Sequence, residues 1–154
     1  MRGTKQDIAI QVTKKTKAGG ISLREIEKLV ETVCRRFNTP KTAVSIVLVG
    51  DAGMRRLNKQ FLNLNRSTDC LSFDLSDNLA GSGKLFELII NVERARKEAK
   101  QRKLPFKAEL ALYIIHALLH NLGFDDSRPD LAEQMHRTED RILKQLSYGF
   151  VYNA

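Results

Sequence analysis

One stretch of the sequence, residues 107–121, constrains the fold more than any other because its side chains are apolar on nearly every side. A helix that is hydrophobic all round must be buried, either in the core of a protein or in a membrane. The most apolar part, Leu110 to Leu119, is too short to cross a bilayer and contains a histidine. We therefore expect a central helix around which the rest of a domain packs.

The segments around this helix alternate between strand and helix patterns. Period-two alternation and β-branched runs predict strands at residues 7–13, 43–49, 70–75 and 85–92. Helical spacing of apolar residues predicts further helices at residues 23–37, 52–61, 93–103 and 130–146. A length of 154 residues fits one domain, residues 1–154. The expected fold class is α+β, with a small mixed sheet of about four strands packed by about five helices.

Positive charge is concentrated in two parts of the chain. The formal net charge is +8, and residues 1–18 and 94–107 carry more than the whole excess. Clustered positive charge is typical of proteins that bind polyanions, nucleic acid first, although a solvated helix face explains the same pattern. The expected RNA contacts are the basic residues of the helix at 93–103, namely Arg94, Arg96, Lys97, Lys100, Arg102 and Lys103.

Other classes of protein are not supported. Cys34 and Cys70 lie far apart and form no CxxC motif, so neither a disulfide framework nor a cysteine-based zinc site is predicted. The first residues contain no apolar core of the length that a signal peptide needs. We expect a cytoplasmic protein with no membrane partner.

The central helix carries two of the three histidines, His116 and His120, one turn apart. Side chains at i and i+4 share a helix face, about 5–6 Å apart at Cβ, which is the spacing that two imidazoles need to bind one metal ion. Gly123 allows the chain to leave the helix and double back, so that Asp126 can reach the same ion. These residues predict a metal site on the buried helix, with positions left open for water. The alternative is a pair of hydrogen-bonded core histidines.

Several segments resemble the YbeY family of metal-dependent endoribonucleases. HALLHNLGFDD, residues 116–126, is similar to the family signature HGLLHLLGYDH, and STDCLSF, residues 67–73, is similar to PTDVLSF. Residues 85–91 and 133–143 resemble a strand and the closing helix of the family. The resemblance implies metal-assisted hydrolysis of single-stranded RNA in rRNA maturation and ribosome quality control. It implies ribosomal RNA and proteins of the small ribosomal subunit as partners.

Carried over residue by residue, the resemblance assigns His116 and His120 to the first two metal ligands. Asp126 stands where the family has a third histidine. One divalent ion is implied, zinc first, although two histidines and one carboxylate also suit iron. In the family an arginine linked to activity stands where this chain has Leu62, and Arg66 is the nearby residue expected to neutralise phosphate charge.

Four positions depart from the family pattern, namely Leu62, Asp74, Ala117 and Asp126. Because Leu62 and Asp126 concern the catalytic centre, a second hypothesis is an RNA- or ribosome-binding module with weakened or lost activity. A third is a metal-dependent hydrolase of peptides or small molecules. Ala117 counts against the third, because the zinc-peptidase motif HExxH has its catalytic glutamate at that position.

Overall fold

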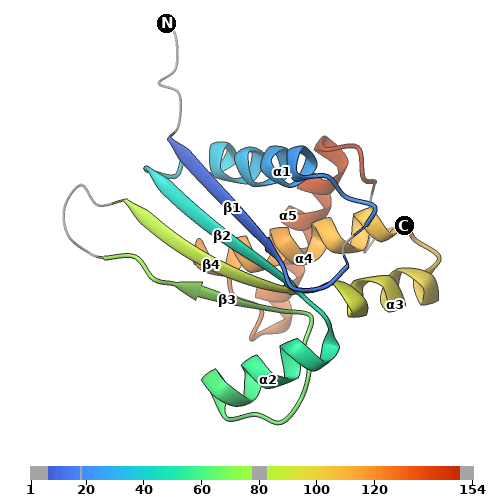
Figure 1. Cartoon of the computed structure of the whole chain (residues 1–154). Helices are drawn as coiled ribbons and strands as arrows, with labels where there is room; N and C mark the ends of the chain where they lie inside the picture. The colour runs from blue at the N-terminus through green and yellow to red at the C-terminus, as the bar shows by residue number, and fades with distance from the viewer. Residues whose placement is uncertain (1–6, 18, 78–82, 150–154) are drawn as a thin grey trace, which may run out of the picture.

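One mixed sheet organises the part of the chain that the structure describes, residues 7–17, 19–77 and 83–149 of a computed structural model (Figure 1). Its strands are β1 (Ile8–Lys14), β2 (Thr42–Val49), β3 (Cys70–Asp74) and β4 (Lys84–Asn91). They are arranged in the order β1-β2-β4-β3. Strands β1, β2 and β4 are parallel, and β3 is antiparallel to β4.

The helices of the described residues are α1 (Leu23–Arg36), α2 (Asp51–Leu62), α3 (Val92–Arg102), α4 (Phe106–Asn121) and α5 (Pro129–Gln145). Each helix and strand agrees with a predicted segment to within one residue at either end. Local chemistry explains the agreement at α1, where Ser22 and Glu25 form a capping box. The predicted α+β class is confirmed.

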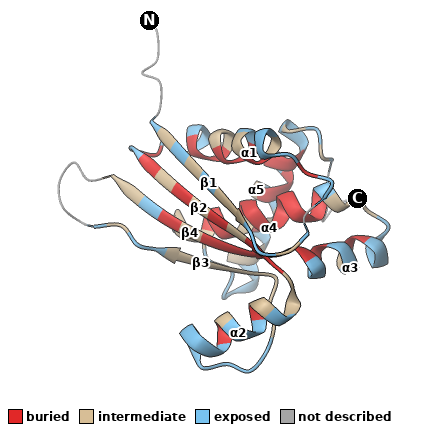
Figure 2. Cartoon of the chain, viewed as in Figure 1, coloured by how far each residue is buried: buried red, intermediate tan, exposed pale blue. Residues whose placement is uncertain are grey.

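Helix α4 is the central helix that the sequence predicts. Eleven of its sixteen residues are buried, and it contacts α1, α3, α5, β3 and β4 (Figure 2). Helices α1, α4 and α5 lie on one face of the sheet. The strands present this face with alternate residues that are almost fully buried, namely Val44, Ile46, Leu48, Phe86, Leu88 and Ile90. No helix among the described residues has the length and hydropathy needed to span a membrane.

The opposite face of the sheet is only partly covered. Val49 and Ile89 form a small apolar cluster with Met54 of α2. The helical spacing of Met54, Leu57 and Phe61 predicts that all three point inward, and for Phe61 this prediction is wrong, because Phe61 is 55% exposed. Its ring instead lies against Phe73, with 5.5 Å between the centroids. No helix or strand of the described residues covers the outer side of α2, so its last turn remains at the surface.

The central position of α4 predicts a large cost for truncating its side chains. Leu118 is fully buried, and Leu118→Ala should lower the free energy of unfolding by about 2–5 kcal/mol, since a cavity replaces packed atoms. The matched control is Leu23→Ala, because Leu23 is 51% exposed and its truncation should cost under about 0.5 kcal/mol. Urea denaturation of both variants measures the difference. Equal losses would contradict the packing described.

Candidate metal centre

The side chains of His116, His120 and Asp126 converge near the C-terminal end of α4. The Nε2 atoms of His116 and His120 are 3.1 Å apart, and Oδ2 of Asp126 lies 3.5 Å from the first and 3.6 Å from the second. A tetrahedral ion with bonds of about 2.1 Å holds its ligand atoms about 3.4 Å apart. Among the described residues, these three form the group whose ligand atoms could hold a metal ion. The predicted ligands are therefore brought together.

The turn after α4 places Asp126 on the histidine face. Gly123 has a φ of +99°, a conformation that glycine adopts without strain. The N–H of Phe124 then donates to the carbonyl of Leu119 at 2.9 Å, which closes the end of the helix. The ring of Phe124 packs edge-on against Phe37 at 5.4 Å. This turn explains how a residue six positions after His120 reaches the same point.

The outer nitrogens of both imidazoles have partners that determine where the protons lie. Nδ1 of His116 is 2.8 Å from Oε2 of Glu139, and Nδ1 of His120 is 3.1 Å from the carbonyl oxygen of Phe124. A carbonyl only accepts, and an ionised carboxylate only accepts, so each Nδ1 carries a proton and donates it. In the neutral rings, the two Nε2 lone pairs then face each other and the carboxylate of Asp126.

Three acceptor atoms this close repel one another unless a cation or a shared proton lies between them. A hydrogen bond between the two neutral rings would need a proton on one Nε2. If His120 supplied it, its bare Nδ1 would face the carbonyl of Phe124, and two acceptors would meet there instead. The same transfer at His116 would set its bare Nδ1 against the carboxylate of Glu139. The donor set therefore fits a divalent metal ion better than the hydrogen-bonded pair of neutral core histidines.

Glu139 is a candidate supporting residue of the site that the sequence reasoning did not single out. It lies on α5, fully buried, and its Oε1 has no hydrogen-bond partner among the described residues. Burial raises the pKa of Glu139, whereas its bond to His116 acts in the opposite direction. Burial disfavours a charged His116, but Glu139, with help from nearby Asp69 and Asp126, raises the pKa of His116 overall. Such carboxylates orient ligand histidines and increase their basicity.

The segment that resembles PTDVLSF is anchored by one buried side chain, Asn91. Its Nδ2 donates to Oδ1 of Asp51 at 3.1 Å, to Oγ of Ser67 at 3.0 Å and to the carbonyl of Thr68 at 3.1 Å. Its Oδ1 accepts from the backbone N–H of Arg94 at 3.0 Å, which caps the start of α3. The end of β4, the start of α3 and residues 67–68 are thus held as one unit.

This unit borders a cavity of about 200 Å³ that reaches His116. Its polar walls come from α3, α4 and the anchored segment, and they include Asp69, Arg94, Glu98, Arg102, Glu109 and Tyr113. Nη1 of Arg102 is 2.8 Å from Oε1 of Glu109, so that pair is already formed. A substrate group in this cavity would lie next to a candidate metal ligand.

The structure does not bring Arg66 or Leu62 to this cavity. Arg66 is exposed, and its backbone carbonyl accepts from Nδ2 of Asn58 at 2.9 Å. Neither residue is among the cavity's lining residues. Leu62, 48% exposed, ends α2. The role of Arg66 stays a prediction.

The six basic residues expected to contact RNA are all exposed, but two have structural partners. The guanidinium of Arg96 donates to the carbonyls of Lys17 and Gly19 and lies 4.7 Å from the centre of the Phe106 ring. Arg102 is paired with Glu109. No side-chain ion pair is found in the described part of the chain for the other four, namely Arg94, Lys97, Lys100 and Lys103. Residues 1–6 and 18 of the N-terminal basic stretch lie outside the described residues. RNA contact by α3 stays a prediction.

The chain was compared with known proteins. The family model described as Endoribonuclease YbeY matches residues 11–147. The chain is 30% identical to Endoribonuclease YbeY of Geobacter sulfurreducens over 145 residues, covering 91% of this chain and 97% of that protein. It is 40% identical to the protein of that name from an Anaeromyxobacter species over 102 residues, covering 66% of this chain and 53% of the relative. A Thermotoga maritima protein with a known solution structure shares the fold, with a TM-score of 0.60, 21% identity and coverage of 90% and 91%.

The contact between Glu139 and His116 predicts an effect on metal affinity. Glu139→Gln keeps the shape of the side chain but removes its charge, so the affinity for zinc should fall by about 10–100-fold. The matched control is Glu133→Gln on the same helix, because Glu133 is exposed and pairs only with Arg137 at 3.8 Å. Competition with a chromophoric chelator measures both affinities. A control variant that lost as much affinity would show a general charge effect instead.

Proposed function

Since the chain belongs to the YbeY family of endoribonucleases, we propose that it hydrolyses single-stranded RNA with one divalent ion held by His116, His120 and Asp126. The observation that carries the proposal is the group of three acceptor atoms, 3.1–3.6 Å apart, beside a polar cavity. A divalent ion bound there supplies a Lewis acid for a phosphoryl oxygen and lowers the pKa of a bound water.

The residues of the chain itself orient the reaction. Glu139 and the carbonyl of Phe124 accept from the Nδ1 atoms, so that in the neutral rings the Nε2 lone pairs of both histidines are aimed at one point. Asp126 adds a negative charge where the family has a neutral imidazole, which makes the ligand set harder and a bound water less acidic. We propose zinc as the resident ion.

Substrate binding is proposed to depend on the charges of α3. Arg94 has no side-chain ion pair in the described part of the chain and lines the cavity that reaches His116, so its guanidinium can neutralise a phosphate there. Lys97, Lys100 and Lys103 would attract the RNA backbone without reading its sequence. Arg66 is proposed as an outer phosphate contact. The family supports a cytoplasmic role in rRNA maturation and ribosome quality control, with ribosomal RNA and small-subunit proteins as partners.

A second candidate function follows from the position of Leu62. Where an arginine would serve the family's activity, the chain has an exposed apolar side chain, and Arg66 does not line the cavity at His116. A protein that binds metal and RNA but turns over slowly, or not at all, is therefore the competing proposal. A measurement of RNA cleavage distinguishes this proposal from that of an active endoribonuclease.

The test combines metal content with RNA cleavage. In protein purified without chelator we expect one equivalent of metal and cleavage of single-stranded but not double-stranded RNA. His116→Ala should lose the metal and reduce cleavage by about 100-fold or more, since it removes a direct ligand rather than a supporting group. The control is His136→Ala, which removes the chain's third histidine, on α5; because this ring acts on the pKa of Glu139, we expect only a small loss of metal and cleavage beside that of His116→Ala.

The outcomes separate the hypotheses. Folded parent protein that contains no metal and takes up none would overturn the metal centre. Stoichiometric metal and salt-sensitive RNA binding without cleavage would favour the binding module. Asp126→His restores the family's third ligand, so cleavage that rises in this variant would identify the carboxylate as the cause of a slow reaction.

A further inference from the structure

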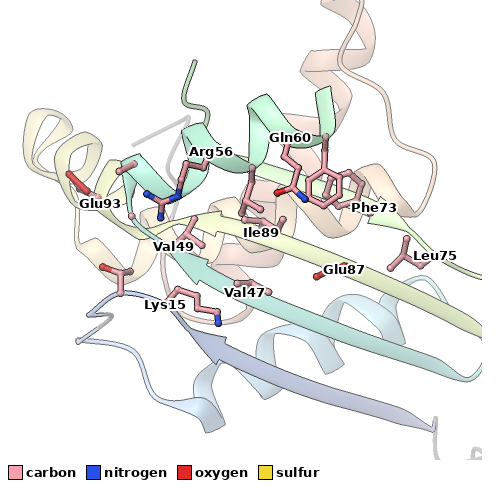
Figure 3. A pocket seen from close by; sticks show the side chains of 16 residues that line it. Lys15, Val47, Val49, Arg56, Gln60, Phe73, Leu75, Glu87, Ile89 and Glu93 are labelled. Atoms are coloured by element: carbon pink, nitrogen blue, oxygen red, sulfur yellow. The ribbon is translucent and has the colours of Figure 1, made fainter. Parts of the chain in front are cut away.

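A larger cavity, of about 760 Å³, lies on the face of the sheet opposite α4 (Figure 3). Its floor includes Val47, Val49 and Ile89, whose neighbours in the strands point toward α4. Helix α2 and strand β3 form its walls, with Phe61 and Phe73 among the lining residues. A cavity of this size and apolar character is typical of sites for small organic ligands. None of the candidate metal ligands lines it.

Two positive side chains lie at the end of the cavity where β2 finishes. A Cβ atom added to Gly53 would lie 3.8 Å from Nη2 of Arg56 and 3.4 Å from Cβ of Val49. The guanidinium of Arg56 therefore lies near the end of β2. The backbone N–H of Lys15 donates to the carbonyl of Leu48 at 2.8 Å, which places Lys15 at the same end. Neither Arg56 nor Lys15 forms a side-chain ion pair within the described ranges.

One carboxylate shares this end with the cations but is already engaged. Glu93 lines the cavity, and its Oε1 accepts from the backbone N–H of Asp51 at 3.1 Å. The two positive charges of Arg56 and Lys15 exceed the single negative charge of Glu93, so this end of the cavity remains net positive and can bind an anion. A phosphate suits this pair, because arginine binds it through two parallel hydrogen bonds and lysine adds a point charge.

The other end of the cavity has a different character. Glu87 lies on the apolar floor, in register with Phe73 of β3, and forms no ion pair among the residues described. A carboxylate in such surroundings needs N–H donors to compensate for lost water. Val49 is in register with Asn91, four residues beyond Glu87 on β4, so about 13 Å of strand separates Glu87 from the end of the cavity at Val49.

We infer that this cavity binds a guanine nucleotide, either free or at the end of an RNA chain. Its phosphate lies between Arg56 and Lys15, and its base lies along the rings of Phe61 and Phe73. Glu87 then accepts from the ring N–H and the amino group on the Watson–Crick edge of guanine. Adenine has an acceptor beside its amino group, which a carboxylate repels. This inference does not depend on the proposed function, because the two sites share no residue.

Binding of GMP, AMP and guanosine, measured by calorimetry, tests the inference on the full-length protein. GMP should bind more tightly than both. Arg56→Gln should weaken GMP about tenfold, as expected for one lost charged hydrogen bond, and leave guanosine unchanged. Glu87→Gln should remove the preference for GMP over AMP. If the natural ligand is an RNA end, a 5′-phosphorylated oligonucleotide that begins with guanosine should bind more tightly than one that begins with adenosine, because contacts of the backbone with α3 are the same in both. If the natural ligand is a free nucleotide, the two oligonucleotides should bind equally.

The matched control is Lys59→Gln, which removes one positive charge from the same helix. Lys59 contacts Asn63 at 3.0 Å and does not line the cavity, so GMP affinity should not change. Parent protein that does not bind GMP would overturn the inference. Equal effects of Arg56→Gln and Lys59→Gln would also overturn it, as would loss of GMP binding in His116→Ala, which would place the nucleotide at the metal centre.

Discussion

The burial of α4 is the constraint on which the rest of the structure depends. A helix that is covered on almost every side leaves its two histidines only partly exposed, so protein groups satisfy much of the hydrogen bonding of their rings. Glu139 and the carbonyl of Phe124 do so on the outer side of the rings. The inner nitrogens then face Asp126 with their lone pairs. The same packing that stabilises the core therefore creates a position that favours a cation.

Much of the fold could be predicted because its local causes are visible in the sequence. The capping box of α1 and the period-two strands located the elements to within one residue. The helical spacing of His116 and His120, followed by Gly123, predicted the three candidate ligands that the structure brings together. Glu139 could not be identified in the same way, since its role arises only when α5 docks on α4. One indication was available, because an acid at position 139 shares the buried helix face of Met135 and Ile142.

The charge pattern was informative about the region but not about each residue. A run of basic residues in the sequence does not distinguish a side chain that binds RNA from one that supports the fold. Arg96 binds two backbone carbonyls, and Arg102 compensates the buried carboxylate of Glu109, so both are needed before any ligand arrives. Arg94 is different, because it lines the cavity beside His116 and has no partner of this kind. Long-range contacts, which periodicity does not reveal, make this distinction.

Asp126 as the candidate third ligand and Leu62 in place of an arginine both make the charge around the candidate metal site more negative. Asp69, Asp126 and Glu139 all act on His116, so the surroundings of the candidate ion are negative. That field increases the attraction for a cation but opposes the approach of a phosphodiester. A chain with Leu62 in place of an arginine must therefore bring positive charge from elsewhere if it is to cleave RNA. Arg94, which the buried Asn91 positions through the cap of α3, is the residue whose geometry meets that requirement.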